Sequence, residues 1–342
     1  MNPQKIKIAI LGVGRWGVHF VRNFLSHPET EVVAIVDPNA ENLAQCRDKF
    51  ALANQPITLA SSWESIRNSL DFDAVVVVTP ASTHYPIIAD ALELGYHVLS
   101  EKPLTLDAYQ CLELKDLALA RQKILLVDHT YLFHPVVLRG KEILTSGNLG
   151  QMLYGYASRT HLGPVRQDVD ALWDLAIHDI AIFNAWLGQT PSFVQAQGTS
   201  WLQSEIADLV CLTLTYPQGF QAFIHLCWLN PDKQRRLCLV TEQGTLIFDE
   251  MSQDSPLTLQ RGHFVREGNF FLPTGQSLEV IEVEKAEPLK TLCNTFVEAI
   301  RTGNGGAISS GQVGAELVQV LSCLTQSLQA QGKVVSVPSL DE

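Results

Sequence analysis

Two side chains suited to proton transfer, Asp174 and His178, stand four residues apart. Their segment also carries an apolar stripe at helical spacing, which predicts a helix with both polar groups on one face. A histidine titrates near neutral pH and can take a hydroxyl proton, while a nearby carboxylate orients its ring. We therefore predict that Asp174 and His178 are catalytic; the alternative is an ion pair on a helix surface. Asp179 adds a possible metal ligand, but no further ligand at matched spacing follows, so no metal is predicted.

Lys102 lies within the sequence Glu-Lys-Pro at residues 101–103, directly after a predicted strand. In an open parallel sheet the carboxyl end of a strand faces the ligand crevice. A lysine at this position can donate a hydrogen bond to a developing alkoxide. We therefore predict that Lys102 is catalytic and that Glu101 and Lys102 both contact a cofactor. The alternative for Lys102 is an ordinary solvated loop residue.

Residues 12–17 fit the pattern G-x-G-x-x-G and link a predicted strand to a predicted helix. In a dinucleotide site the three glycines allow a tight turn, close approach of the pyrophosphate, and packing of the helix on the strand. A carboxylate at the end of the next strand binds ribose hydroxyls and repels a 2′-phosphate, so NAD is preferred to NADP although an arginine near the phosphates complicates the choice. The alternatives are glycines that serve only the turn and an aspartate that serves only the turn before Pro38. The predicted cofactor contacts are Gly12, Gly14, Arg15, Trp16, Gly17 and Asp37.

A further polar segment, residues 79–84, follows the fourth predicted strand and begins a helix. We expect Thr79 and Pro80 to lie at the edge of the crevice against the nicotinamide ribose, with His84 hydrogen-bonding nearby. All three are predicted cofactor contacts. The alternative for His84 is an incidental histidine within a helix-start signal.

The first third of the chain must position Lys102 and the predicted cofactor contacts. It alternates short β-branched runs with helical stretches. That pattern is typical of parallel βαβ units covered by helices on both faces, and the all-apolar run 74–78 predicts a central buried strand. Two βαβαβ halves predict the Rossmann strand order 3-2-1-4-5-6, so we assign residues 1–126 to an NAD(P)-binding domain. The predicted strands are 5–11, 31–36, 57–60, 74–78, 97–100 and 124–127, and the predicted helices are 16–26, 41–50, 83–94 and 107–122.

The remaining residues, 127–342, change to longer alternating segments separated by turn signals at 216–219 and 243–244. Such a pattern predicts a large, mainly antiparallel open sheet with accompanying helices, hence an α/β domain. The predicted strands are 152–160, 193–201, 207–216, 221–228, 236–241 and 245–248, and the predicted helices are 135–145, 171–187, 289–301 and 313–329.

Composition narrows the functional classes further. The chain has 342 residues, of which 46% are hydrophobic and 18% charged, typical of a soluble globular protein with two domains. Lys+Arg 24 against Asp+Glu 36 gives a net charge of −12, which disfavours nucleic-acid or membrane-surface partners. The seven scattered cysteines contain no C-x-x-C pair and indicate reduced thiols. Without a signal-like or membrane-spanning run, we expect a cytoplasmic location.

Taken together, the glycine turn, the T-P-x-x-x-H at 79–84, the E-K-P at 101–103 and the D-x-x-x-H at 174–178 resemble the Gfo/Idh/MocA oxidoreductase family. The resemblance spans nearly the whole chain. It implies a Rossmann domain followed by an α/β domain whose open sheet serves substrate binding and oligomerisation, here as a homodimer or homotetramer. It also implies hydride transfer between NAD(P) and a sugar, sugar nucleotide or polyol, with Lys102 and His178 acting on the substrate hydroxyl and Asp174 beside them.

Two segments depart from the commoner family pattern. Residues 168–173 replace a glycine-rich stretch, and residues 127–131 stand where many members have a Gly-Phe-Asn-like run. Both are similar to a branch with enzymes resembling UDP-sugar 3-dehydrogenases. That similarity makes His129, Arg159, His161 and Asp168 candidate substrate contacts beside Lys102, Asp174 and His178; the alternative for Arg159, His161 and Asp168 is surface loop residues.

The resulting hypothesis is an NAD-dependent dehydrogenase or ketoreductase that acts on a carbohydrate secondary alcohol. A rival hypothesis is a catalytically silent NAD-binding regulator of the same fold, which would have no need of Lys102, Asp174 and His178. A third is an oxidoreductase with a non-carbohydrate substrate. Assays of hydride transfer separate the three.

Overall fold

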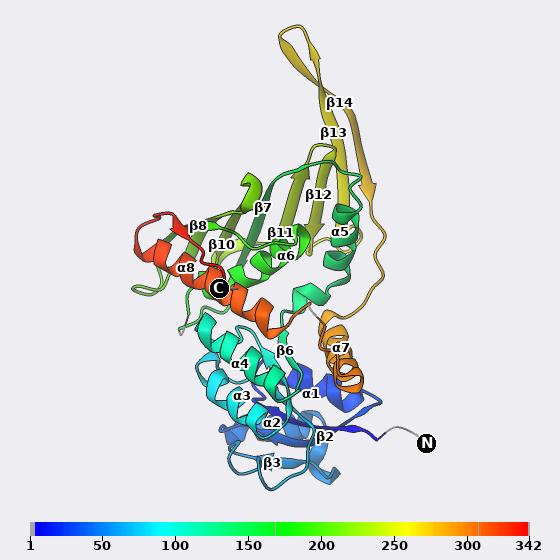
Figure 1. Cartoon of the computed structure of the whole chain (residues 1–342), viewed down its shortest axis with the longest axis vertical. Coiled ribbons are helices and arrows are strands. Elements are labelled where there is room, and N and C mark those ends of the chain that lie inside the picture. The colour runs from blue at the N-terminus through cyan, green and yellow to red at the C-terminus, as the bar shows by residue number, and fades with distance from the viewer. Residues whose placement is uncertain (1–3, 168, 307, 341–342) are drawn as a thin grey trace. The chain divides into compact units, whose positions relative to one another are not determined.

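The computed structural model describes residues 4–167, 169–306 and 308–340, so the predicted substrate contact Asp168 lies outside the described residues. The chain forms two compact units (Figure 1). The first unit comprises Met1–Phe133 and Glu287–Val318, and the second comprises His134–Ala286 and Gln319–Glu342. The sequence-based division at residue 126 did not anticipate that a late segment returns to the first unit. An apolar stripe predicts that a helix buries one face, but it does not say in which core.

The first unit is built on a parallel sheet of six strands in the order β3-β2-β1-β4-β5-β6, as predicted. Every residue of the central strand β4 is buried, because parallel sheets are covered on both faces. The carboxyl ends of β1, β4 and β5 lead into the segments predicted to bind the cofactor. The strands are β1 (Ile6–Leu11), β2 (Thr30–Val36), β3 (Thr58–Ala60), β4 (Ala74–Val77), β5 (His97–Glu101) and β6 (Leu125–Asp128).

Two helices of this unit, α2 and α4, begin at a capping side chain. Asn39 accepts the Glu41 N–H at the start of α2, and Asp107 accepts two N–H groups at the start of α4. The helices are α1 (Gly17–Ser26), α2 (Ala40–Lys49), α3 (His84–Glu93), α4 (Ala108–Ala120), α7 (Pro288–Thr302) and the first part of α8 (Gly311–Gln329), with short turns η1 (Leu52–Asn54), η2 (Ala81–Thr83) and η3 (Thr130–Phe133).

The second unit is built on a nine-stranded sheet in the order β14-β13-β12-β11-β7-β10-β9-β8-β15. The pairing is antiparallel except between β7 and β10, which run parallel. All six predicted strands of this region are present, while β13, β14 and β15 were not predicted. The strands are β7 (Met152–Leu162), β8 (Phe193–Thr199), β9 (Leu209–Thr215), β10 (Gln221–Cys227), β11 (Leu229–Thr241), β12 (Gly244–Asp249), β13 (Leu257–Glu267), β14 (Phe270–Val280) and β15 (Val335–Ser336).

Helices cover one face of this sheet, and β13 and β14 extend beyond the other strands as a two-stranded ribbon (Figure 1). The covering elements include α5 (Pro135–Thr145), the π-helical turn η4 (Leu172–Ala176) and α6 (Ile177–Leu187), and a short turn η5 (Pro217–Gly219) joins β9 to β10. Two glycines allow close packing here: a Cβ on Gly155 of β7 would stand 2.4 Å from Phe183, and one on Gly140 of α5 would stand 2.6 Å from Trp186. The opposite face exposes Tyr154, Tyr156, Phe193 and Phe223.

Within the described residues, no helix is long and apolar enough to cross a membrane.

Candidate active site

The three glycines of the turn after β1 differ in whether the surrounding protein leaves room for a side chain. Gly12 has φ +90°, and a Cβ there would stand 2.4 Å from the Val78 carbonyl oxygen. A Cβ on Gly17 would stand 2.0 Å from the Gly12 carbonyl oxygen, so both positions need glycine for packing. A Cβ on Gly14 would meet nothing within 4 Å. The space above Gly14 is what the close approach of a pyrophosphate requires.

Asp37 fastens this turn to the end of β2. The Val13 N–H donates to its Oδ2 at 2.8 Å and the Asn39 N–H donates to its Oδ1 at 2.8 Å. The Asn42 side-chain amide lies 3.2 Å from both oxygens. A carboxylate offers about four acceptor positions, so a ribose hydroxyl would compete with Asn42 rather than with the backbone donors. Asp37 thus stabilises the turn, and it can accept hydrogen bonds from a ribose only when the Asn42 amide moves away from its carboxylate.

His84 joins the loop after β4 to the loop after β5. Its Nε2 lies 2.8 Å from the Thr79 carbonyl oxygen and its Nδ1 lies 2.9 Å from the Pro103 carbonyl oxygen. Burial lowers the pKa of His84, and a neutral ring can donate to only one of these carbonyls. Both ring nitrogens face protein carbonyls, so His84 holds the two loops that would line the cofactor. Thr79 and Pro80 stand on the first of these loops, where Thr83 donates from Oγ1 to Thr79 Oγ1 at 2.7 Å.

A buried carboxyl pair lies beside Lys102. Glu101 and Asp128 are register partners at the ends of β5 and β6, and their side chains hydrogen-bond to each other. Two carboxyl groups can do this only if they share a proton. Burial, followed by the charge of Asp128, raises the pKa of Glu101 to about 8, and burial raises the pKa of Asp128 to about 6. Glu101 also accepts the Lys102 N–H at 2.7 Å, so the pair fixes the backbone that carries the lysine.

His129 presents a neutral acceptor. Ser309 donates from Oγ to the Val127 carbonyl oxygen at 2.7 Å, so at 2.8 Å it must accept from His129 Nδ1. That tautomer leaves Nε2 as a lone-pair acceptor, buried and without a hydrogen-bond partner among residues 4–167, 169–306 and 308–340. Burial, with a smaller effect of the Lys102 charge, lowers the pKa of His129 to about 3. His129 Nε2 therefore keeps an unused lone pair in a buried position beside the charge of Lys102.

In the second unit Asp174 lies in η4, and His178 lies in the first turn of α6. The Trp228 indole N–H donates to Asp174 Oδ2 at 3.1 Å, and Arg166 Nη1 lies 3.7 Å from Oδ1. The helix predicted over 171–187 is present, but its first turn, Leu172–Ala176, is π-helical. Hydrophobic spacing cannot detect a single wide turn, although such turns are frequent at functional sites.

Arg159 forms a buried ion pair with Asp179, the residue after His178. Its Nε and Nη2 donate to the two carboxylate oxygens at 3.0 and 2.8 Å. Both side chains are nearly inaccessible, at 5% and 3% exposure. The pair fastens α6 to β7 and commits Arg159 to structure, so we no longer place Arg159 among the substrate contacts. Within the described ranges, no group of three or more His, Cys, Asp or Glu side chains is arranged to hold a metal ion.

His161 lies at the end of β7 in the same electrostatic neighbourhood as Asp174. In the ladder with β11, Leu229 pairs with Leu162 and Gln234 pairs with Thr160, so the bulge at 230–233 faces His161. Burial lowers the pKa of His161, the charges of Arg235, Lys233 and Arg159 lower it further, and the charge of Asp174 raises it. His161 is therefore neutral near pH 7 and available as a hydrogen-bonding group.

Each unit thus brings together part of the predicted set. The first gathers Glu101, Lys102 and His129, and the second gathers His161 and Asp174, with His178 at the start of the following helix. The sequence analysis missed Asp128, Arg166 and Trp228. Asp128 directly follows the predicted strand 124–127, which neighbours the strand before Glu101 in the predicted sheet order, and register reasoning could have used that signal.

Comparisons with known proteins place these sites in a family. The family model for oxidoreductases with an NAD-binding Rossmann fold, Gfo/Idh/MocA, matches residues 6–129, and the model for a Gfo/Idh/MocA C-terminal domain matches residues 137–247. The UDP-N-acetylglucosamine 3-dehydrogenase of Acidithiobacillus ferrooxidans is 26% identical over 298 residues, covering 86% of this chain and 88% of the relative. Its solved structure superposes with a TM-score of 0.81 at 22% identity and covers 96% of this chain and 98% of its own.

Two other solved structures share the whole architecture. An oxidoreductase from Magnetospirillum magnetotacticum MS-1 is 30% identical with a TM-score of 0.79, covering 93% of this chain and 99% of its own. An inositol dehydrogenase homologue from Azotobacter vinelandii, complexed with NADH and myo-inositol, has a TM-score of 0.80 at 18% identity and covers 98% of both chains. The chain belongs to the Gfo/Idh/MocA oxidoreductase family, with an NAD-binding Rossmann domain followed by the C-terminal domain of that family.

Proposed function

We propose that the protein transfers a hydride between nicotinamide and a secondary alcohol or ketone of a carbohydrate, with sugar nucleotides as the first class to test. The observation that carries the proposal is an NAD-binding unit whose turn is open at Gly14, on one chain with the acid–base set Asp174 and His178. The UDP-N-acetylglucosamine 3-dehydrogenase among the relatives and the dTDP-sugar 3-reductase of Actinomadura kijaniata favour sugar nucleotides.

The residues present fit NAD. In the proposed complex the turn at residues 12–17, including Arg15 and Trp16, holds the pyrophosphate. Asp37 holds the adenosine ribose and disfavours a 2′-phosphate, which makes NAD the preferred cofactor over NADP. Thr79, Pro80 and Glu101 line the nicotinamide end. NAD supplies hydride acceptance when it is bound.

In the oxidation direction we assign each side chain a role in removing the hydroxyl proton or in stabilising the charge that its removal creates. A ring nitrogen of His178 takes the hydroxyl proton as the C–H electron pair leaves the same carbon. The Lys102 ammonium donates a hydrogen bond to the developing oxyanion. Asp174, oriented by the Trp228 indole N–H, supports the charged form of the histidine. His129 and His161 offer hydrogen-bonding groups to other substrate hydroxyls.

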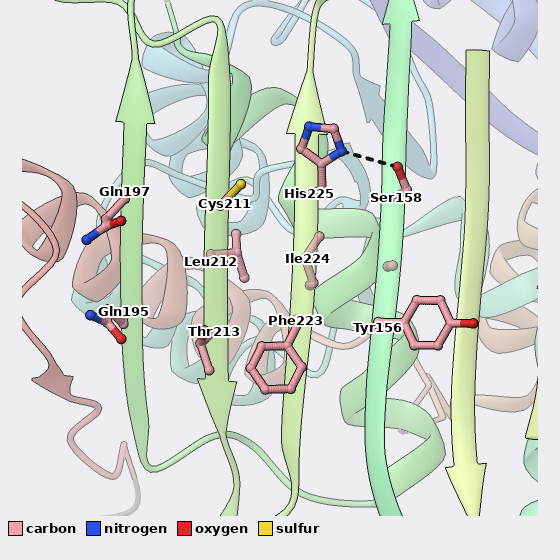
Figure 2. A pocket seen from close by; sticks show the side chains of 11 residues that line it. Tyr156, Ser158, Gln195, Gln197, Cys211, Leu212, Thr213, Phe223, Ile224 and His225 are labelled. Carbon is pink, nitrogen blue, oxygen red and sulfur yellow. Dashed lines mark hydrogen bonds between the residues drawn. The ribbon is translucent and has the colours of Figure 1, made fainter. Parts of the chain in front are cut away.

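We also propose a homo-oligomer formed through the open face of the second sheet, in the cytoplasm. A shallow hollow on this face is shown in Figure 2, where Tyr156, Phe223 and Cys211 point out of the sheet beside Ser158 and His225. None of the residues that line it is Asp, Glu, Lys or Arg, although the chain carries a net charge of −12. Depletion of charged groups around exposed aromatic rings is typical of the core of a protein interface.

The test of the proposed activity measures NADH formation from NAD with a panel that includes UDP-N-acetylglucosamine and myo-inositol. We expect at least one carbohydrate to be oxidised, with kcat lowered about 10²-fold or more in Lys102→Ala and in His178→Ala. NAD affinity, measured by calorimetry, should stay within a fewfold of wild type in His178→Ala. Unchanged turnover in either variant would remove that residue from the mechanism. NAD binding without oxidation or reduction of any carbohydrate would favour a regulator or another substrate class.

A further inference from the structure

The connection between β8 and β9, residues 200–208, is a well-fastened loop. A backbone bridge between Gln203 and Ile206 closes its tip, and the Asp208 N–H donates to the Thr199 carbonyl oxygen at 2.9 Å to close its base. The fully buried Asp208 carboxylate accepts the backbone N–H groups of Trp201 and Leu202 through Oδ2, at 2.6 and 2.8 Å. These bonds fix the backbone of the residues that follow β8.

The same loop is tied to the segments that hold Asp174. The Trp228 N–H donates to the Asp208 carbonyl oxygen at 3.0 Å, and the indole N–H of Trp228 donates to the Asp174 carboxylate. The Ala171 N–H, at the start of η4, donates to the Ala207 carbonyl oxygen at 2.9 Å. Hydrogen bonds therefore run from the loop to the carboxylate of the proposed site without leaving the second unit.

A third tie comes from Gln203, whose side-chain amide donates to the Arg166 carbonyl oxygen at 2.8 Å. The Arg166 guanidinium faces Asp174. The other oxygen of the anchoring carboxylate, Asp208 Oδ1, is buried and has no hydrogen-bond partner in the described part of the chain. An unpaired buried oxygen is costly, and a loop retained at such a cost is expected where the loop has a task.

Trp201 is the exposed element of this loop. Trp201 is 62% exposed, and within the described residues its indole N–H donates no hydrogen bond and its ring stacks on no other ring. Tryptophan offers a wide apolar face at small conformational cost, and an exposed ring fixed by its backbone is suited to stack on a flat ligand. The adjacent Leu202 is 54% exposed and extends the apolar surface.

We propose that Trp201 is a binding residue for the substrate, a platform that stacks on a ring of the ligand held at Asp174. The ligand ring that stacks on Trp201 needs one flat or weakly polar face. Both the C–H face of a pyranose and the face of a nucleobase meet this requirement. This inference rests on the proposed function, because that function supplies the carbohydrate. It adds a recognition residue on a loop that carries none of the proposed catalytic groups.

The experiment uses the full chain with saturating NADH and measures the binding of UDP-N-acetylglucosamine, UDP and N-acetylglucosamine by calorimetry. Three proteins are compared with wild type: Trp201→Ala, Trp201→Phe and the control Tyr109→Ala, which removes a 71% exposed ring on α4 of the first unit. We expect Trp201→Ala to raise Kd about tenfold, the size of one stacked ring. Trp201→Phe should recover most of the affinity, and Tyr109→Ala should bind as wild type does. Far-UV circular dichroism and the unfolding temperature verify that each variant is folded.

The three ligands identify which ring is stacked. Weaker UDP binding in Trp201→Ala assigns the platform to the base, and weaker N-acetylglucosamine binding assigns it to the sugar; either result supports the inference. Equal affinities in wild type and Trp201→Ala would overturn it. A Trp201-dependent affinity without any hydride transfer would overturn the proposed function and leave the platform standing. Failure of wild type to bind any of the three would reject both.

Discussion

At the scale of single residues, the proton shared by Glu101 and Asp128 makes stability depend on pH. In the folded pair the pKa of Glu101 is raised to about 8 and the pKa of Asp128 to about 6, against ordinary values of 4.5 and 3.8. The folded state therefore binds more protons than the unfolded state, so the stabilisation is complete below the unfolded values and is lost as pH rises through the folded ones. Asp128→Asn removes the second charge while its amide can still donate to Glu101. We expect its loss of stability between about pH 5 and about pH 9 to be smaller than that of wild type by about 1.4 kcal/mol, or roughly 3 °C in unfolding temperature.

The matched control is Asp116→Asn, which removes a largely exposed carboxylate 3.4 Å from Lys115. Its thermal unfolding should follow wild type across the same pH range, because exposed ion pairs contribute little. Parallel pH curves for wild type and Asp128→Asn would show that the two carboxyls do not share a proton in solution.

A strand end led to the prediction for Lys102 and helical spacing to that for Asp174, but neither indicated the residues that contact these two side chains. Asp128 was inside a predicted segment of interest, and only the register of β6 against β5 shows that it meets Glu101. Trp228 is separated from Asp174 by 54 residues, and no spacing rule links them. Arg159 was a candidate substrate contact on the strength of the family resemblance, whereas tertiary packing pairs it with Asp179. Long-range partners are chosen by packing, which a single sequence does not encode in any local pattern.

At the scale of elements, the glycine turn allows a paired prediction. Gly17→Ala places a methyl group 2.0 Å from a backbone oxygen, so the turn or α1 must shift. Gly14→Ala meets no protein atom within 4 Å, so the apoprotein should fold as wild type does. We expect Gly17→Ala to lower stability by about 1–3 kcal/mol and Gly14→Ala to leave it within about 0.5 kcal/mol. Gly14→Ala should nevertheless weaken NAD binding about tenfold or more, because its methyl group occupies the approach of the pyrophosphate.

Denaturant unfolding measures the stability of both variants, and calorimetry measures their affinity for NAD. Wild-type NAD affinity in Gly14→Ala would mean that the cofactor does not approach this turn. Wild-type stability in Gly17→Ala would mean that the helix start is more adjustable than its packing indicates.

The buried ion pair gives a second prediction at this scale, because it joins α6 to β7. Arg159→Met leaves the Asp179 carboxylate buried without its partner, which should lower stability by about 3–5 kcal/mol. The double variant Arg159→Met/Asp179→Leu removes both charges and should recover most of that loss. The KM of the double variant for its carbohydrate should stay near the wild-type value, since Arg159 is assigned to packing. Recovered stability with a strongly raised KM would instead return Arg159 to the substrate site.

Elements with a clear period were predictable, and those that depend on neighbours were not. The strands of the first sheet and the helices α5 and α7 follow from apolar spacing and turn signals. β13 and β14 were not predicted because residues 260–280 are exposed on both faces. Their ribbon therefore has no alternation of buried and exposed positions. The π-helical turn η4, which holds Asp174, was not predicted because its residue spacing differs from that of an α-helix only over one turn.

At the scale of the whole molecule, the cysteines offer a reporter for assembly. None of the seven forms a disulfide, six are buried, and Cys211 alone is exposed. Cys211 lies on the open sheet face shown in Figure 2, in register with His225. If this face joins copies of the chain, Cys211 should be protected in the assembly. Phe223→Asp places a charge among the residues that line the hollow on this face and should release monomers.

We therefore expect a thiol reagent to modify much less than one thiol per chain in the native wild-type protein and one in Phe223→Asp, with all seven reacting in denaturant. The work is best done near pH 8 to 9, because burial raises the pKa of Cys211 and the thiolate is the reacting form. Sedimentation velocity gives the mass of each species, and Cys211→Ser identifies the thiol that reacts in Phe223→Asp. A wild-type protein that sediments as a monomer and exposes one reactive thiol would leave the face without a partner copy. In that case the uncharged hollow around Phe223 would need another occupant.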